Sequence, residues 1–236
     1  TLCTKILFED VIKTIAKNSF GPPANNKFPV ILSIEMHCSF KFQERMWQIC
    51  EEHFKGMILR LPEDEDEVLS LYSPWELRER ILIKGKRIKV DPSQGLSSMS
   101  SNTLLESDSD SDEDDEEGAA LATVPKVSKQ TQSTKDLNPK EKKKAEKKMK
   151  KTVIHPEWSK LIFLAAIHFK SFDIKNKCFE MSSYSEKKCK KLCSNEADRK
   201  VFCKHNLRQL SRVYPFGGRI DSSNMQPIHA WASGCQ

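Results

Sequence analysis

The sequence lacks any run of about 20 apolar residues, the length that a helix needs to cross a bilayer, and no signal-peptide pattern precedes its first helical segment. We therefore expect neither a membrane-spanning nor a secreted protein. Its eight cysteines are irregularly spaced, which favours reduced thiols in a cytosolic protein over a disulfide framework. A start methionine is also missing, and a helical pattern begins soon after Thr1. We expect the sequence to be part of a longer chain.

Aromatic residues are absent from the middle of the sequence, residues 91–152, where Ser, Asp, Glu, Thr and Lys predominate. Such a composition cannot bury enough apolar surface to fold and is typical of a disordered segment. The prediction is therefore two folded blocks, residues 1–90 and 153–236, joined by a charged linker. Neither block approaches the roughly 250 residues of a complete eight-stranded α/β barrel.

The whole chain has a net charge of +6, but positive and negative residues are unevenly distributed within this linker. Glu106–Glu117 is almost wholly acidic, whereas Lys140–Lys151 consists mostly of lysine. A basic balance suits either nucleic acid or an anionic membrane, and charge alone does not choose between them. Three serines stand among the acidic residues in a pattern that acidophilic kinases phosphorylate, namely Ser107, Ser109 and Ser111.

Hydrophobic periodicity in the first block predicts an alternation of helices and strands. Residues 6–16 and 39–54 have helical spacing, whereas residues 28–34 and 80–84 are short β-branched runs typical of buried parallel strands. The apolar face expected for the second helix comprises Phe42, Met46, Trp47, Ile49 and Cys50. Helix alternating with strand is characteristic of parallel α/β folds.

The second block continues this pattern. Residues 161–167 resemble a strand, and residues 209–215 are predicted to be extended. We expect a helix over Ser183–Leu192, because Ser183 and Glu186 have the spacing of a capping box.

Polar residues follow the predicted strands of the first block. Glu35 ends one strand, and Lys84 and Lys86 end the other. Ligands bind at the carboxyl ends of parallel strands in barrels and open α/β sheets. Polar residues also occur at strand ends because these ends meet solvent. This pattern alone is therefore only modest evidence for a ligand-binding site.

Several segments, in this order, resemble the catalytic region of eukaryotic phosphoinositide-specific phospholipases C. They are FPVILSIEMHCS (28–39), ILIKGK (81–86), MSSYSE (181–186), LSRVYP (210–215) and RIDSSN (219–224). The resemblance implies an α/β fold, a TIM-type (β/α)8 barrel built from two halves, X and Y, that a variable linker joins. The sequence would hold the end of X, the linker and the start of Y, with about half of the barrel strands.

The family resemblance also implies an activity and the residues that serve it. The expected activity is calcium-dependent hydrolysis of phosphatidylinositol 4,5-bisphosphate to diacylglycerol and inositol trisphosphate, in signalling at the inner face of the plasma membrane. Glu35 matches a calcium ligand. Tyr214 matches an aromatic residue that packs against the inositol ring. The expected contacts to the headgroup phosphates are Lys84, Lys86, Ser183 and Arg212.

Both catalytic histidines of the family would lie upstream of Thr1, so we expect none in this sequence. The isolated polypeptide is accordingly predicted to be inactive and not to close a barrel, because strand edges would lack partners. The alternative is a catalytically inactive relative that keeps the phosphoinositide pocket. A nucleic-acid-binding protein is disfavoured, because no recognised module is present.

Two further features have competing interpretations. Cys189, Cys193, Cys203 and His205 have spacings that a zinc site could use, but the surrounding lysines oppose a cation, and structural thiols are the preferred interpretation. The acidic linker resembles the family's autoinhibitory linker, which anionic lipid would repel from the active site. The block Lys140–Lys151 could bind acidic lipid, pair with the acidic run or act as a localisation signal, and these alternatives stay open.

Overall fold

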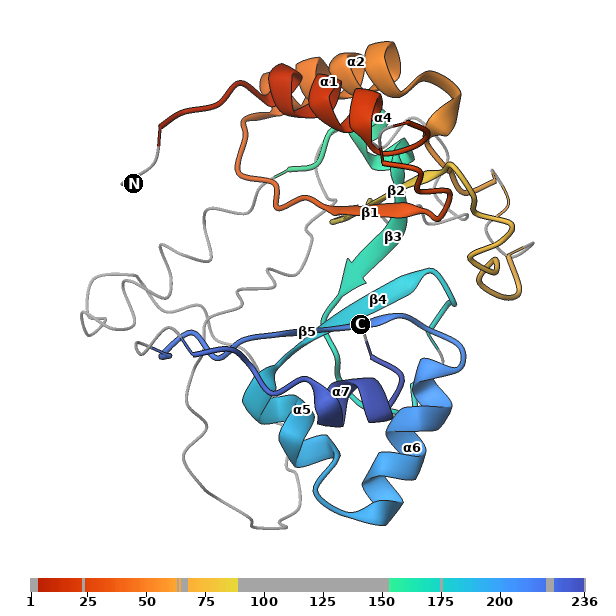
Figure 1. Cartoon of the computed structure of the whole chain (residues 1–236), viewed down its shortest axis with the longest axis vertical. Coiled ribbons are helices and arrows are strands. Elements are labelled where there is room, and N and C mark those ends of the chain that lie inside the picture. Colours follow the sequence, from red (N-terminus) through yellow and green to blue (C-terminus); the bar gives the residue numbers. More distant parts are fainter. Residues whose placement is uncertain are drawn as a thin grey trace, which may run out of the picture. The chain divides into compact units, whose positions relative to one another are not determined.

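The five strands of the described residues form one sheet, in which each strand is parallel to its neighbours and the order follows the chain (Figure 1). The strands are β1 (Val30–Ser33), β2 (Ile81–Gly85), β3 (Ile162–Ile167), β4 (Glu180–Ser185) and β5 (Ser211–Tyr214). The computed structural model describes residues 4–22, 24–62, 64, 68–88, 153–174, 176–219 and 223–235. The acidic run, its three serines and the lysine block therefore lie outside the described residues.

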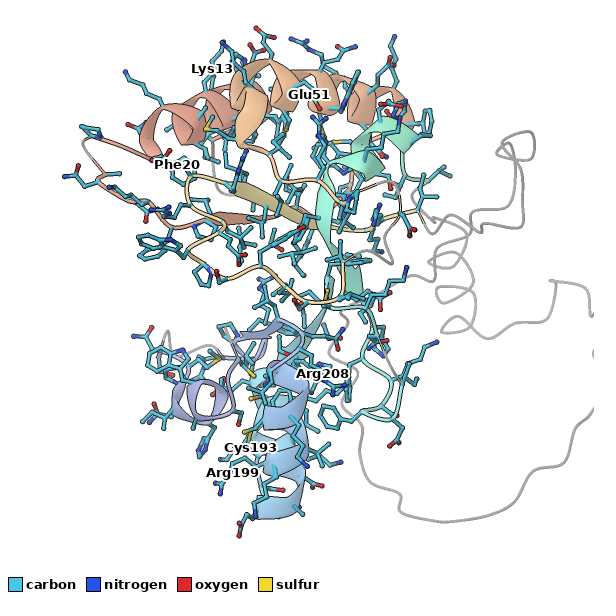
Figure 2. All side chains as sticks on the ribbon, turned by 90° about the vertical axis from the view of Figure 1, so that its right-hand side faces the viewer. Lys13, Phe20, Glu51, Cys193, Arg199 and Arg208 are labelled. Carbon is cyan, nitrogen blue, oxygen red and sulfur yellow. The ribbon has the colours of Figure 1, made fainter. Side chains whose placement is uncertain are left out.

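Both blocks of the sequence contribute helices that lie beside the sheet (Figure 1). They are α1 (Phe8–Asn18), α2 (Phe40–Phe54), η1 (Lys55–Met57), α4 (Pro156–Lys160), α5 (Glu186–Leu192), α6 (Glu196–Asn206) and α7 (Ile228–Ala232). Helix α1 packs on α2, α2 on α4, and α4 on β3, whereas α5 packs on β4, β5, α6 and α7. Figure 2 shows Lys13 and Glu51 among the charged side chains of α1 and α2. Among the described residues, no helix is both long enough and apolar enough to cross a membrane.

The two blocks of the sequence join in one sheet and belong to one compact unit. Strand β2 pairs with β3, with Ile83 opposite Ile162 and a register shift immediately after it. Gln43 of α2 strengthens the junction: its side-chain nitrogen donates to the Val153 carbonyl (2.9 Å), and its oxygen accepts from the His155 amide (2.8 Å). The buried glutamine thus satisfies backbone groups more than a hundred positions away in sequence.

The sheet is strongly curved. Strands β1 and β5 stand at its opposite edges, and four strand spacings of about 4.8 Å would separate them by about 19 Å in a flat sheet. Nevertheless, Arg212 of β5 donates from Nη1 to Ser33 Oγ of β1 at 3.4 Å. The edge strands must therefore face each other across a concave surface, as opposite strands do in a barrel. This confirms the α/β class and the barrel-like half that the sequence predicts.

Two predictions of local structure were wrong. Phe42 is 66% exposed, and the buried face of α2 instead includes Gln43, which the helical pattern of apolar residues could not reveal. Ser183 does not cap a helix but lies within β4, in register with Arg212. Helix α5 begins at Glu186, and Ser185 caps it by accepting from the Lys188 amide (3.3 Å). Parallel pairing with β5 therefore outweighs the local capping preference.

Candidate functional site

The concave face of the sheet has an apolar layer with a polar layer above it. Leu82, Leu164 and Met181 belong to one buried cluster, against which Ile31 and Leu210 pack. Side chains two residues apart on a strand point to the same face. Two positions after Ile31, Leu82, Met181 and Leu210 stand Ser33, Lys84, Ser183 and Arg212. We call these four side chains the polar quartet.

Lys84 is the most buried charged residue of the quartet, with only 7% of its surface exposed. It occupies the fully buried strand β2, and its ammonium donates to Ser183 Oγ of β4 at 3.2 Å. The lysine thereby spans β3, where its register partner is the apolar Leu164. A buried ammonium loses much of its hydration and is costly unless other groups compensate. An anion bound beside Lys84 would interact favourably with the positive charge of its ammonium.

Arg212 completes the quartet from the opposite edge of the sheet. It lies beside Ser183 in the register of β4 and β5, and it donates to Ser33 across the concave surface at 3.4 Å. Ser33 was missed by the sequence analysis. It could have been identified from the same two-residue spacing, because it stands between Ile31 of the apolar layer and Glu35. Two cations and two hydroxyls therefore converge from four strands.

Gly85 allows the strands beside Lys84 to approach each other closely. A Cβ atom at this position would lie 3.1 Å from Cδ1 of Ile162 and 3.3 Å from the carbonyl oxygen of Ile34. Either contact is tighter than ordinary van der Waals packing, so a side chain here would require the Ile162 side chain and the Ile34 carbonyl to shift slightly. The glycine between Lys84 and Lys86 thus leaves room for these two neighbours where the polar layer begins.

Two other predicted contacts lie at strand ends. Lys86 follows β2 two residues after Lys84, and Tyr214 is the last residue of β5, two residues after Arg212. Both side chains are partly buried. Each is therefore placed at the carboxyl end of the sheet, on the side where ligands of parallel α/β folds bind. Their roles toward a ligand stay predictions.

Glu35 lies just after β1 and is largely exposed, with 76% of its side chain accessible. Its carboxylate is 3.4 Å from Nε2 of His37, which is also exposed, and such surface pairs contribute little. Calcium needs roughly six to eight oxygen ligands. In the described part of the chain, no group of three or more His, Cys, Asp or Glu side chains could hold a metal ion. These residues alone do not fit a calcium site, and Glu35 fits only as one contributor.

An ion pair fixes the loop that follows β5. The Arg219 guanidinium pairs with the Glu186 carboxylate at the start of α5, and Glu186 also accepts from the Phe216 amide at 3.3 Å. The hydrogen bond from Arg219 holds the pKa of Glu186 below its usual value. The loop after Tyr214 is thereby tied to the helix that follows β4.

Comparison with protein families gives two matches, which together cover most of the chain. Residues 1–87 match the family "Phosphatidylinositol-specific phospholipase C, X domain", and residues 158–236 match "Phosphatidylinositol-specific phospholipase C, Y domain". The two matched regions contain all five described strands.

Curated relatives resemble the whole chain. It is 33% identical over 239 residues to the 1-phosphatidylinositol 4,5-bisphosphate phosphodiesterase delta-3-A of Danio rerio, and covers 27% of that protein. It is 35% identical over 240 residues to the delta-4 enzyme of Homo sapiens, and covers 29% of it. In both cases the whole of this chain is aligned. The chain therefore spans less than a third of the length of these relatives.

A solved structure supports the fold. The crystal structure of L. pealei PLC21 matches with a TM-score of 0.64 and 30% sequence identity, over all of this chain and 26% of that protein. The S. officinalis PLC21 structure matches equally well, with the same TM-score and identity.

Proposed function

Since the chain belongs to the phosphatidylinositol-specific phospholipase C family, we propose that the full-length protein hydrolyses phosphatidylinositol 4,5-bisphosphate to diacylglycerol and inositol trisphosphate. This chain supplies much of the wall that binds the headgroup. The observation that carries the proposal is the convergence of Lys84, Ser183 and Arg212 from three different strands. The names of the curated relatives support the same substrate.

The side chains of the quartet have the chemistry that a polyphosphorylated headgroup requires. The Lys84 ammonium is a point charge, whereas the Arg212 guanidinium can donate two parallel hydrogen bonds to one phosphate. Ser183 holds the Lys84 ammonium and has a hydroxyl of its own to donate. Lys86 adds a third cation two residues beyond Lys84, and Tyr214 presents a ring at the end of β5 against which the inositol would pack.

Calcium is the proposed metal, with Glu35 contributing one carboxylate ligand from the end of β1. A bound calcium ion would neutralise negative charge that develops on the reacting phosphate. The other ligands and the acid–base groups would come from parts of the protein outside the described residues. The contribution of this chain is to place Glu35 beside the headgroup cations: its neighbour Ile34 donates its amide to the Lys84 carbonyl at 2.9 Å.

The setting of this activity follows from its substrate. A lipid of the inner leaflet places the protein at the cytoplasmic face of the plasma membrane as a peripheral, signalling enzyme. The acidic run Glu106–Glu117 would be repelled by the same anionic surface, which suits an autoinhibitory linker. We also propose that the chain divides into an X part at 1–90, a linker at 91–152 and a Y part at 153–236. The linker serines are proposed phosphorylation sites.

The test is calcium-dependent release of inositol trisphosphate from vesicles that contain phosphatidylinositol 4,5-bisphosphate, with the full-length protein. Removal of calcium by a chelator and the Glu35→Ala substitution are each expected to abolish most of the activity. Lys84→Met is expected to lower kcat/KM by about 10- to 100-fold, the effect of losing a charged hydrogen bond. The matched control is Lys41→Met, on the exposed side of α2, which should leave activity unchanged.

Failure to release inositol trisphosphate from these vesicles would contradict the proposed activity. If the inactive wild-type protein still bound the vesicles, and Lys84→Met weakened that binding, the protein would be an inactive phosphoinositide-binding relative. If neither protein bound, the quartet would have no role toward the headgroup.

A further inference from the structure

An open hollow lies at the amino end of the sheet, away from the polar quartet. It has a volume of about 370 Å³, and the described residues that line it are Phe20, Gly56, Met57, Arg78, Glu79 and Arg80. Arg80 directly precedes β2, whereas Lys84 stands near the end of that strand. We call this hollow the amino-end pocket. None of its lining residues belongs to the proposed headgroup site.

The amino-end pocket forms where three segments of the first block come together. One segment follows α1 and contains Phe20, which Figure 2 labels. The second is η1, and the third leads into β2. Ile58, directly after η1, forms a parallel bridge with Ile81, the first residue of β2. This pairing holds η1 beside the segment that carries the two arginines.

Backbone hydrogen bonds fix the segment before β2 in place. The Glu79 amide donates to the Lys27 carbonyl at 2.8 Å, and the Arg80 carbonyl accepts from the Val30 amide at 3.0 Å. Both bonds join this segment to the residues at and just before the start of β1. The arginine side chains therefore extend from backbone that the sheet holds in position, which reduces the entropy that a ligand must overcome.

The two guanidinium groups are themselves oriented by main-chain contacts. Arg78 donates from Nε to the Trp75 carbonyl at 3.0 Å, and its guanidinium carbon lies 3.7 Å from the centre of the Trp75 ring. Arg80 donates from Nη1 to the Gly56 carbonyl. Although Glu79 stands between them, neither arginine forms an ion pair with another described residue. Each guanidinium has further N–H donors that these contacts do not use.

Unfavourable backbone conformations are concentrated at the same pocket. Among the described residues other than glycine, φ is positive at Asn25, Lys55 and Glu79. Glu79, with φ of +55°, lines the pocket, and Lys55, with φ of +44°, directly precedes Gly56 of its lining. The left-handed region is costly for residues with a side chain, and such strain is often found at ligand-binding positions. It is therefore an indication of a site that is independent of charge.

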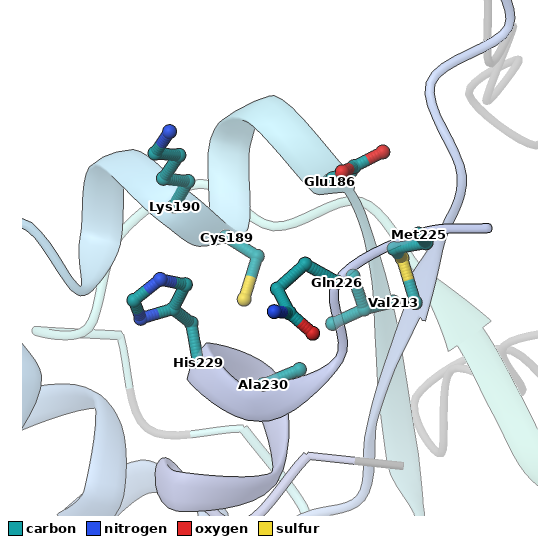
Figure 3. A pocket seen from close by; sticks show the side chains of 8 residues that line it. All are labelled: Glu186, Cys189, Lys190, Val213, Met225, Gln226, His229 and Ala230. Atoms are coloured by element: carbon teal, nitrogen blue, oxygen red, sulfur yellow. The ribbon is translucent and has the colours of Figure 1, made fainter. Parts of the chain in front are cut away.

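A hollow in the second block provides a contrast. It lies between α5, β5 and α7 and has a volume of about 100 Å³, and Figure 3 shows Cys189 and Gln226 directed into it. Glu186 at its rim is already paired with Arg219. A space of this size holds a few water molecules. The amino-end pocket, by contrast, falls within the range of small-molecule sites, about 300–1,000 Å³.

We propose that the amino-end pocket binds an organic phosphate monoester that carries an apolar group. The phosphate would accept hydrogen bonds from Arg78 and Arg80, whose planar sets of donors match phosphate geometry. Phe20 and Met57, both partly buried, would contact the apolar group. The two arginines outweigh the single carboxylate of Glu79, so the pocket favours an anion over a cation. Binding here does not depend on the proposed hydrolysis, because the two sites share no residue.

The experiment is calorimetric titration of phenyl phosphate into the full-length protein, with saturating inositol 1,4,5-trisphosphate present to occupy the headgroup site. Inorganic phosphate and phenol are the comparison ligands, because each carries only one half of the probe. We expect phenyl phosphate to bind at one site and more tightly than either half. Absence of saturable binding, or equal affinities for phenyl phosphate and inorganic phosphate, would overturn the proposal.

Variants that stay folded by circular dichroism assign the binding to this pocket. Arg78→Gln and Arg80→Gln should each raise the Kd for phenyl phosphate about tenfold or more, through loss of charged hydrogen bonds. Phe20→Ala should weaken binding of phenyl phosphate but not of inorganic phosphate. The matched control is Arg199→Gln, which removes the same charge from α6 and should leave the Kd unchanged, as should Lys84→Met. Equal losses in Arg78→Gln and Arg199→Gln, or a loss in Lys84→Met, would show that the probe binds elsewhere and would contradict the proposal.

Discussion

The two faces of strands β4 and β5 differ in how their polar groups are satisfied. On the concave face, Ser183 accepts a hydrogen bond from Lys84 of β2, and Arg212 donates one to Ser33 of β1. On the helical face, Ser211 donates to Asn206, and the aromatic rings of Tyr184 and Phe202 lie 5.3 Å apart. Alternation of side chains along each strand thus separates the face that we propose binds the headgroup from one that stabilises the fold.

The largest expected effect is a loss of stability from the helical face. Phe202 of α6 is fully buried in a hydrophobic cluster that includes Tyr184 and Cys189, so Phe202→Ala should lower the free energy of unfolding by about 3–5 kcal/mol. The control on the same helix is Val201→Ala, at a position that is 44% exposed. Chemical denaturation followed by circular dichroism measures both. Equal effects of the two substitutions would contradict the description of this face as the stabilising core.

On the concave face, the next largest effect should be on activity rather than on stability. Arg212→Met is expected to reduce hydrolysis of phosphatidylinositol 4,5-bisphosphate by about 10- to 100-fold, through loss of charged hydrogen bonds to phosphate. Arg199→Met removes the same charge from an exposed position on α6, where Figure 2 shows this residue, and serves as control. A comparable loss of activity in both variants would indicate a general electrostatic effect instead of a site.

Ser33→Ala sharpens the comparison by testing contact across the concave face. Loss of the hydrogen bond to Arg212 should raise KM by about 2- to 10-fold with little change in stability. Combined with Arg212→Met, the serine substitution should have almost no additional effect, because its partner is already gone. Steady-state kinetics of the two single variants and the double variant measure this coupling. Fully additive effects would show that Ser33 does not position Arg212.

The smallest expected effect concerns the ion pair between Glu186 and Arg219. Because the folded state lowers the pKa of Glu186, its ionised form stabilises the fold above the unfolded value of about 4.3, and this contribution is lost as pH falls through the lower folded pKa. Glu186→Gln should therefore be less stable than the wild type near neutral pH. The difference should shrink in acid, as urea denaturation at several pH values would show. A difference that did not change with pH would exclude this linkage.

The sequence was informative wherever local chemistry dominates. Short apolar runs predicted β1, β2 and β3, and Lys84 was noted because it ends such a run. The α/β class and the barrel-like half were confirmed by the sheet and by the solved relatives. Strand β4 was obscured because its serine-rich sequence resembles a helix cap, and only pairing with β3 and β5 reveals it.

Long-range contacts explain what the sequence could not supply for the site. Family resemblance named Lys84, Ser183 and Arg212, but the role of Ser33 depends on sheet curvature, which brings positions 179 residues apart into contact. Burial of Gln43 likewise depends on backbone groups beyond the linker. The roles of Glu35, Lys86 and Tyr214 toward metal and substrate stay predictions, because the residues described here do not complete their surroundings.

Binding of soluble inositol 1,4,5-trisphosphate to the full-length protein tests the central claim most directly, since it isolates the headgroup from membrane and turnover. Calorimetric titration should compare the wild type with Lys84→Met and with the control Lys41→Met. The polar quartet predicts a Kd that is raised about tenfold or more by Lys84→Met and is unchanged by Lys41→Met. Equal affinities for all three proteins would show that the buried lysine of β2 does not hold the phosphates.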